Sequence, residues 1–327
     1  MRFLLDDGQR EFARSLDALL TASDTPAVVR AWSTGDHGPG RALWGRLAEA
    51  GVLALAVPEE YDGLGLLPVE LAVAFTELGR HAVPGPLVET VAAAALLDRL
   101  GDRHATWLRG MASGKTVATL CPPADDTPYA LDADMADLVL VVTGDTLRVA
   151  ESTGPVQPSA DPARRLSRPT GGTVLAEGPH LRRAAAYATD IGTLVTAAQA
   201  LGVGRALLDR TVSHVRRRHQ FGRPIGSFQA VKHRLADVLI SLEFTEPLIH
   251  AAALSLASAS EHTGQAIAAA KAAAGDTVHL AARTALQCHG AIGYTDELDL
   301  SLWIRKAHAL RTAWGTPSAC RARVLTA

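Results

Sequence analysis

Two long stretches of apolar residues at helical spacing flank one short polar segment, residues 216–229, which reads RRRHQFGRPIGSFQ. The apolar positions are Leu194, Ala198, Leu201 and Leu208 before the segment, and Leu235, Val238, Leu239 and Leu242 after it. Gly222, Pro224 and Gly226 disfavour a helix inside the segment. The pattern therefore predicts two long helices joined by a loop, and it restricts this part of the chain to a helical bundle.

Composition excludes several classes of protein. The 327 residues suffice for one large domain or for two to three smaller ones. A net charge of -2 gives no sign of a nucleic-acid partner or of a membrane partner. The cysteines, Cys121, Cys288 and Cys320, are far apart and lack C-x-x-C spacing, so neither a disulfide framework nor a zinc site is predicted. The 12 histidines show no H-E-x-x-H pattern, so the sequence predicts no metal site.

The N-terminal stretch gives no targeting signal. Asp6 and Asp7 follow the first residues closely, so no signal peptide is expected. No uninterrupted apolar run approaches the length of a membrane span. The default expectation is a cytoplasmic protein.

Residues 1–115 are predicted to form a helical domain. Asp6 and Gln9 have the spacing of a capping box in front of the first amphipathic helix. Pro68 is placed to open a later helix at its first turn, and residues 86–100 predict another.

From about residue 116 the apolar residues no longer follow helical spacing. Residues 116–181 are predicted to form a small β-domain. Four short runs read as strands: residues 116–122, 138–144, 146–152 and 173–178. Gly144 and Asp145 are expected to form a hairpin turn between the second and third runs. The region looks too short for a full barrel.

Residues 182–327 are predicted to be helical to the end. Residues 265–286 and 297–313 add two helices to the pair around the opening loop, which is enough for a four-helix bundle. Pro247 is expected to kink or interrupt the second of the four helices.

The chemistry of the opening loop lies in Arg218 and Phe221. Their spacing of three residues puts a planar cation and an aromatic ring on one side of the chain as the helix ends. A guanidinium beside exposed backbone amides suits a diphosphate group. The alternative is an ordinary group of basic residues at a helix C-terminus, where positive charge interacts favourably with the helix dipole.

The order R-x-x-F-G-x-x-I-x-x-F-Q in this loop resembles the flavin-binding loop of the acyl-CoA dehydrogenase family. Residues 51–81 resemble the N-terminal helical domain of the same family. Residues 287–294, QCHGAIGY, resemble its second flavin motif, Q-x-x-G-G-x-G-Y/F, with Ala291 in place of the second glycine. The resemblance implies a mainly α, acyl-CoA dehydrogenase-like fold.

In ordinary members of the family, two subunits hold each flavin. One subunit, here called the owner, supplies the pocket for the flavin ring and the catalytic base. The adjacent subunit, here called the neighbour, supplies the Arg, the Phe and the Gln-Gly-Gly loop. By resemblance, the neighbour's half is present in this chain and would bind FAD through Arg218, Phe221, Gln229, Gln287, Cys288, His289, Gly290, Ala291 and Thr316. The owner's half matches poorly, because residues 121–126, CPPADD, replace the family's Thr-Glu-Pro stretch in the middle domain.

Both of the family's base positions lack a carboxylate. The usual Glu before Gly-Thr is replaced by Trp314, and the alternative position at the start of the first C-terminal helix aligns with Gly192. A general base contributes about 10²–10⁴ in rate. Because neither position can supply one, no catalytic residue is predicted in this chain. Asp190 lies near the second position, but an Asp before an apolar helix more often caps it.

The resemblance therefore implies the non-catalytic, FAD-binding subunit of a heteromeric acyl-CoA dehydrogenase, similar to the two-gene enzymes of steroid breakdown. The implied partner is a full-length family member in a two-plus-two heterotetramer, with the acyl-CoA in the partner's pocket and electron-transfer flavoprotein or a similar acceptor downstream. Two alternatives remain open. One is a homomeric flavoprotein with a relocated carboxylate such as Asp190, and the other is a structural scaffold without flavin contact.

Overall fold

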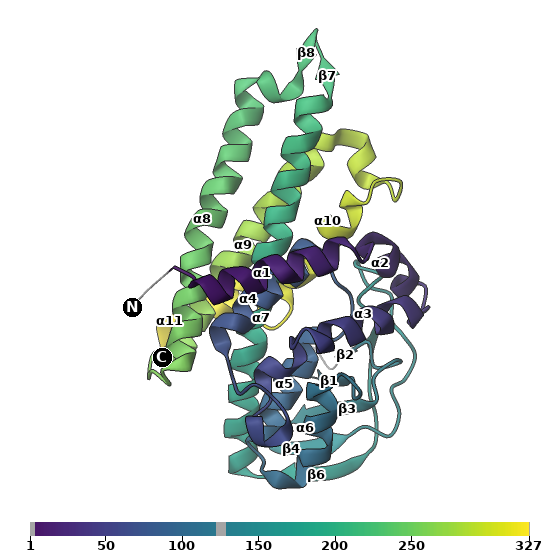
Figure 1. The fold of residues 1–327 in the computed structure, drawn as a ribbon, viewed down its shortest axis with the longest axis vertical. Helices are drawn as coiled ribbons and strands as arrows, with labels where there is room; N and C mark the ends of the chain where they lie inside the picture. Colours follow the sequence, from purple (N-terminus) through teal and green to yellow (C-terminus); the bar gives the residue numbers. More distant parts are fainter. Residues whose placement is uncertain (1–3, 122–128, 327) are drawn as a thin grey trace. The chain divides into compact units, whose positions relative to one another are not determined.

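The computed structural model describes residues 4–121 and 129–326. Helices dominate the described chain and the strands fall in the middle of the sequence, as the sequence predicts (Figure 1). The chain divides into two compact units. The first, here called the bundle unit, comprises Met1–Pro26, Ala72–Val83 and Thr196–Ala327. The second, the sheet unit, comprises Ala27–Leu71 and Pro84–Val195. The three domains proposed from the sequence stay a prediction.

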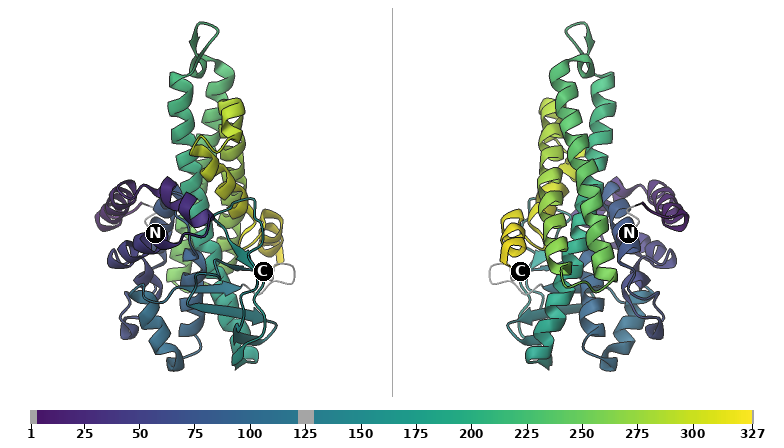
Figure 2. Two further views of the ribbon diagram at one scale, coloured as in Figure 1. Left: turned by 90° about the vertical axis from the view of Figure 1, so that its right-hand side faces the viewer. Right: turned by 90° about the vertical axis from the view of Figure 1, so that its left-hand side faces the viewer.

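The bundle unit is built around the alanine-rich helix α9 (Thr263–His289), which packs against α8 (Gln229–Ala257), α10 (Leu300–Thr312) and α11 (Pro317–Thr326). Both views of Figure 2 show α8 and α9 running side by side. Small side chains on α9 are buried, which allows this close packing. The remaining parts of the unit are α1 (Asp7–Thr21), the end of α4 (Pro68–Arg80), the second half of α7 (Pro179–Arg217), strands β7 (His219–Gln220) and β8 (Arg223–Pro224), and the 3-10 helices η4 (Ile225–Ser227) and η5 (Gly290–Tyr294).

The sheet unit contains a four-stranded sheet in the order β1-β3-β4-β6, in which β1 and β3 are parallel and the other pairs are antiparallel. Its strands are β1 (Ala118–Cys121), β3 (Leu138–Thr143), β4 (Thr146–Val149) and β6 (Thr173–Glu177). All four predicted strands are confirmed, with ends that differ from the predicted ones by up to three residues. The predicted hairpin at Gly144 and Asp145 is also confirmed, because Thr143 pairs with Thr146 across it.

The rest of the sheet unit is short helices and one small second sheet. Helix α5 packs against β1. The elements are α2 (Thr25–Ser33), α3 (Gly38–Glu49), α5 (Leu87–Asp98), α6 (Ala105–Ala112), the 3-10 helices η1 (Leu53–Ala56), η2 (Glu59–Tyr61) and η3 (Asp102–His104), and the pair β2 (Ala130–Leu131) and β5 (Leu166–Ser167).

Local sequence signals are correct at several helix ends. The Asp6 side chain accepts from the backbone of Gln9, and the Gln9 side chain accepts from the backbone of Asp6, which is the predicted capping box. Pro68 opens α4 as predicted. Pro247, in contrast, does not interrupt its helix, since α8 continues through it to Ala257.

Two helices are long and apolar enough to cross a membrane by length and composition, which the sequence analysis does not anticipate. They pass that test because each contains an apolar window with at most two charged residues. The window of α7 is 89% buried inside the protein, as in a core helix of a globular domain. The window of α8 is only 33% buried, so this helix presents apolar side chains at the surface.

Candidate functional site

The opening loop forms a small hairpin between α7 and α8 (Figure 1). Strands β7 and β8 pair, and Phe221 and Gly222 form the turn with φ values of 52° and 77°. A two-residue turn of this kind favours glycine at its second position, whereas a positive φ is uncommon for Phe. The backbone N–H of Ile225 donates to the carbonyl of Arg218 at 2.8 Å and closes the hairpin. The predicted loop is confirmed, and its hairpin is an addition to the prediction.

The side chains predicted to bind the cofactor lie at the surface of this hairpin. The ring of Phe221 is 89% exposed, and Arg218 and Gln229 are also exposed. The Phe221 ring meets the edge of Phe228 at a centroid distance of 6.1 Å, and the Arg223 guanidinium lies 4.1 Å from the Phe228 centroid. These contacts order the loop and leave Arg218 and Phe221 open to another molecule.

The second predicted motif begins in the last turn of α9 and continues into η5. Gly290 ends α9 with a φ of 66°, and its N–H donates to the carbonyl of Leu286. Gln287, Gly290 and Ala291 are exposed, whereas Cys288 and His289 are half-buried. Burial raises the pKa of the Cys288 thiol, so this cysteine is not an activated thiolate.

The two motifs meet through a residue that the sequence analysis misses. The ring of His214, in the last turn of α7, stacks on the ring of His289 with centroids 4.0 Å apart. Burial lowers the pKa of both imidazoles, and for His214 the charges of His289 and Arg218 lower it further. The structure thus brings the Arg218 loop and the Gln287 motif together. No spacing rule marks His214 among the other histidines.

The first predicted base position holds a half-buried tryptophan. Trp314 has a φ of 55° and precedes Gly315, whose φ is 120°. Thr316 caps helix α11, since its Oγ1 accepts from the N–H of Ala319 at 3.2 Å. The described residues that form this turn offer no carboxylate where the family has its base.

The side chain of the buried Lys271 donates hydrogen bonds to the backbone of this turn. The Nζ of Lys271 donates to the carbonyls of Leu310, Arg311 and Gly315 at 3.1, 3.1 and 2.8 Å. Burial lowers the pKa of Lys271 to about 8. Three carbonyl acceptors satisfy all three of its donors, so its role here is to fix the backbone between α10 and α11.

The second base position, Gly192, is buried inside α7. Asp190 also lies inside this helix, which begins at Pro179, so the expectation that Asp190 caps the helix is wrong. The helix starts earlier because Pro179 suits a first turn and the residues after it continue the helical pattern. The replacement for the middle-domain motif, residues 122–126, lies outside the described residues.

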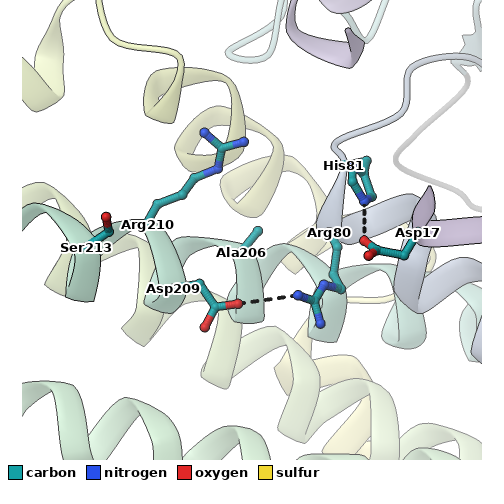
Figure 3. Close-up of a pocket in the computed structure, with 7 residues that line it drawn as sticks. All are labelled: Asp17, Arg80, His81, Ala206, Asp209, Arg210 and Ser213. Atoms are coloured by element: carbon teal, nitrogen blue, oxygen red, sulfur yellow. Dashed lines mark hydrogen bonds and ion pairs between the residues drawn. The ribbon is translucent and has the colours of Figure 1, made fainter. Parts of the chain in front are cut away.

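A pocket of about 320 Å³, lined mostly by polar side chains, lies in the bundle unit (Figure 3). Its lining residues are Asp17, Arg80, His81, Ala206, Asp209, Arg210 and Ser213. The Nε2 atom of His81 lies 2.8 Å from Asp17 Oδ1, and Arg80 pairs with Asp209 at 3.5 Å. Burial raises the pKa of the adjacent Glu77 to about 7. No sequence motif predicts this pocket.

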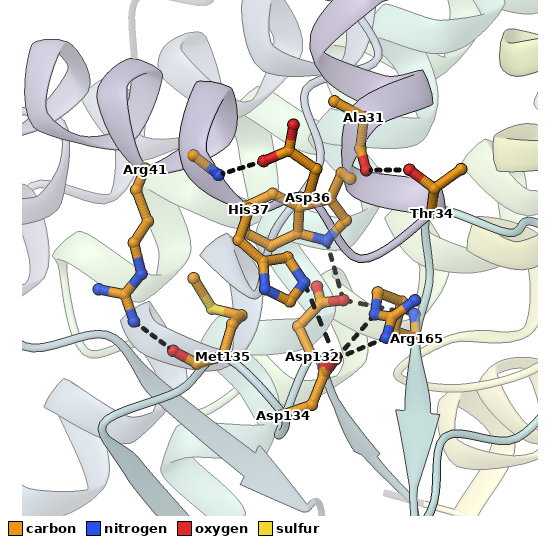
Figure 4. Close-up of polar contacts among 11 residues, drawn as sticks. Ala31, Thr34, Asp36, His37, Arg41, Asp132, Asp134, Met135 and Arg165 are labelled. Atoms are coloured by element: carbon orange, nitrogen blue, oxygen red, sulfur yellow. Dashed lines mark hydrogen bonds and ion pairs between the residues drawn. The ribbon is translucent and has the colours of Figure 1, made fainter.

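A second polar cluster lies in the sheet unit around Asp132 (Figure 4). The indole N–H of Trp32 donates to Asp132 Oδ1 at 3.0 Å, and the backbone N–H of Arg165 donates to the same atom at 3.3 Å. Arg165 also pairs with Asp134 through two contacts of 2.9 and 2.7 Å. Asp132 is fully buried, and burial raises its pKa to about 7. These contacts tie the ends of β2 and β5 to helix α2.

Two family models match most of the chain. The model described as acyl-CoA dehydrogenase, N-terminal domain, matches residues 6–115. The model described as acyl-CoA dehydrogenase, C-terminal domain, matches residues 182–325. The residues between these two matches carry the short strands of the sheet unit.

Individual proteins agree with these matches. Acyl-CoA dehydrogenase IpdE2 of Mycobacterium tuberculosis is 34% identical over 307 residues, which is 92% of this chain and 91% of that protein. A variant of the Tcur3481-Tcur3483 steroid ACAD is 25% identical, with a TM-score of 0.85 over 97% of this chain and 96% of that chain. A chain of the ChsE4-ChsE5 complex from Mycobacterium tuberculosis is 23% identical, with a TM-score of 0.86 over 99% and 98% of the two chains. These likenesses confirm the predicted fold class.

Proposed function

This chain belongs to the acyl-CoA dehydrogenase family, and we propose that it is the non-catalytic, FAD-binding subunit of a heteromeric enzyme. The enzyme would form a Cα–Cβ double bond in a bulky acyl-CoA, for which a steroid-derived thioester is the proposed class. The substrate loses a proton from Cα to a carboxylate of the partner chain. FAD, when bound, supplies the acceptor for the hydride that leaves Cβ. This chain's own residues would bind and orient the diphosphate side of that cofactor.

The observation that carries the proposal is the loss of both base positions. Trp314 fills the first, and it has no group that titrates as a base. Gly192 fills the second and is buried inside a helix, so it offers no side chain at all. Because the reaction requires removal of a proton next to the thioester carbonyl, we expect the partner chain to supply the base.

The exposed motif residues fit the half-site that one subunit lends to its neighbour. Arg218 can offer a planar fork of donors to phosphate oxygens, and Gln287 can donate from its amide. Phe221 and Tyr294 are 89% and 74% exposed, which is unusual for aromatic side chains unless another molecule covers them. A cofactor held between two chains would cover both loops.

Helix α8 provides a surface for the partner. Ile240, Phe244 and Leu248 are exposed and repeat every four residues, so they form one apolar stripe. Leu239 lies beside the stripe and is also exposed. Burial of such a stripe against another chain supports association. The proposed partner is a full-length family member, in a two-plus-two heterotetramer.

The relatives support the proposed substrate class. The Tcur3481-Tcur3483 protein is a steroid ACAD with two named components, and ChsE4-ChsE5 is a complex of two named components. The substrate would lie in the partner's pocket, and electron-transfer flavoprotein or a similar protein would take the electrons from the reduced enzyme.

The test is to purify the chain alone and together with its proposed partner, add FAD, and assay a panel of acyl-CoA thioesters. We expect the chain alone to be nearly colourless and inactive, and the complex to hold two FAD per four chains. Flavin released by denaturation, divided by protein, measures this ratio. Turnover by the chain alone would favour the homomeric alternative, and Asp190→Asn would then test the relocated base. A complex that assembles around flavin without contact from this chain would favour the scaffold alternative.

A further inference from the structure

One oxygen of a buried carboxylate in the bundle unit has no hydrogen-bond partner among the described residues. Glu77, on α4, is only 8% exposed, and its Oε2 atom is shielded from solvent. The Nε of Arg80 lies 3.7 Å from this oxygen, which is beyond hydrogen-bonding distance. Buried carboxylates are normally hydrogen-bonded, closely paired or bound to a metal ion. The Oε2 atom of Glu77 is therefore available to a further partner.

Two more potential ligands surround this carboxylate. The ligating atoms of Asp17, Glu77 and His81 all lie within 4.8 Å of one another. Glu77 and His81 are four residues apart at the end of α4, and the backbone N–H of His81 donates to the carbonyl of Glu77, so both face the same side. Asp17 comes from α1, and its Oδ1 lies 2.8 Å from His81 Nε2.

We propose that Asp17, Glu77 and His81 form a site for a divalent cation such as Zn²⁺, with one imidazole nitrogen and two carboxylate oxygens as protein ligands. An imidazole in the set favours zinc and similar transition metals over Ca²⁺ and Mg²⁺, which prefer oxygen alone. The polar pocket adjoins Asp17 and His81, so it gives an ion a route from solvent and room for a water as fourth ligand.

The geometry needs only side-chain movement to close around an ion. Two ligands bound at about 2.1 Å in a tetrahedral site lie about 3.4 Å apart, so the widest separation must shrink by rotation of a carboxylate. Asp17 is half exposed and does not cap its helix, so its side chain is the one that can rotate toward the ion. The bound ion would contact the Glu77 oxygen that has no hydrogen bond, and it would link α1 to the end of α4.

The site is tested with metal-free, untagged protein titrated with ZnCl₂ by calorimetry, and with CoCl₂ by visible absorption, which reports tetrahedral coordination. We expect one equivalent to bind and the melting temperature to rise. Glu77→Gln keeps the shape of the side chain and removes its charge, and His81→Ala removes the nitrogen ligand. Each should weaken binding by more than about tenfold.

His262→Ala is the matched control, because His262 is an exposed imidazole 3.5 Å from the carboxylate of Glu261. It should bind zinc as tightly as the wild type. The proposal is overturned if the wild type shows no saturable binding. It is equally overturned if Glu77→Gln, which preserves the packing, binds zinc as the wild type does. In that case Glu77 is simply a protonated acid in the core.

Discussion

The imidazole rings of His214 and His289 stack with centroids 4.0 Å apart and an angle of 27° between their planes. His214 lies four residues before Arg218, and His289 is the last residue of α9. The Nδ1 of His289 lies 2.8 Å from the carbonyl of Ala285; since a carbonyl only accepts, this nitrogen is the donor. The stack therefore holds the end of α7, which leads into the Arg218 hairpin, against the first residues of the Gln287 motif.

His214→Ala should weaken FAD binding by the heteromer, because it removes the contact that holds the two motifs together. A stacked pair of rings contributes about 0.5–1.5 kcal/mol, which corresponds to a loss of about two- to tenfold in affinity. His214→Phe keeps a stacking ring and should bind nearly as well as the wild type. Titration of the flavin-free heteromer with FAD, followed by fluorescence, measures both. Equal affinities for all three proteins would show that the stack does not position the loops.

Arg218→Ala should leave the subunits associated and reduce FAD retention. A charge-assisted hydrogen bond contributes about 1.5–3 kcal/mol, or about ten- to a hundredfold in affinity, and excess FAD should restore part of the activity. Arg218→Lys should rescue poorly, because a point charge does not reproduce a planar fork. FAD affinity and size-exclusion profiles of the heteromers give the two readouts.

Arg216→Ala is the control for Arg218→Ala. Arg216 is equally exposed and belongs to the same basic helix end, but it lies outside the R-x-x-F pattern. A general effect of positive charge would make the two substitutions equivalent. If Arg218→Ala assembles and holds FAD as tightly as the wild type, Arg218 only answers the dipole of α7, and the scaffold alternative gains support.

Signals that act over a few residues predict much of this fold. The capping box at Asp6 and Gln9 depends on a spacing of three, and the hairpin at Gly144 and Asp145 depends on the turn's own backbone preference. Both predictions are correct because neither feature depends on contacts with distant parts of the chain. The opening loop is found for the same reason, since Gly222 and its neighbours end one helical pattern before another begins.

Features that depend on tertiary contacts are missed. Pro247 remains inside α8, although the local rule predicts a kink or an interruption, and the interruption does not occur. The strands β2 and β5 are two residues each, and hydrogen bonds between Asp132 and Arg165 lie at their ends. The stack of His214 on His289 and the cluster of Asp17 with His81 join residues far apart in the chain. A local sequence motif therefore cannot predict either contact.

Gly202→Ala should destabilise the bundle unit, because the backbones of α4 and α7 touch at this glycine. A Cβ on Gly202 would lie 1.8 Å from the carbonyl oxygen of Thr76, and one on Gly79 would lie 2.1 Å from that of Gln199. Overpacking of this kind costs about 1–3 kcal/mol or more, so the melting temperature should fall by several degrees. Gly45→Ala is the control, since its Cβ would meet nothing within 4 Å and alanine favours a helix. A melting temperature unchanged in Gly202→Ala would contradict the close approach.

The buried carboxyl of Asp132 should make the sheet unit less stable as the pH rises. Burial is the largest cause of its raised pKa, and the charge of Glu89 raises it further, so the folded protein holds this proton up to about pH 7. The unfolded chain releases it near the ordinary value of 3.8. Between these two pH values the folded state binds more protons, so the free energy of unfolding falls as the pH rises and levels off above about pH 7.

Asp132→Asn should remove this pH dependence, because the amide resembles the protonated acid and its oxygen can still accept from Trp32 and from the backbone of Arg165. The pKa difference corresponds to on the order of 4 kcal/mol between acid and neutral pH. The variant should therefore melt close to the wild type at pH 4 and above it at pH 8. Scanning calorimetry of both proteins across this range measures the difference. A constant gap between the two melting temperatures would show that Asp132 does not change its protonation state over this range.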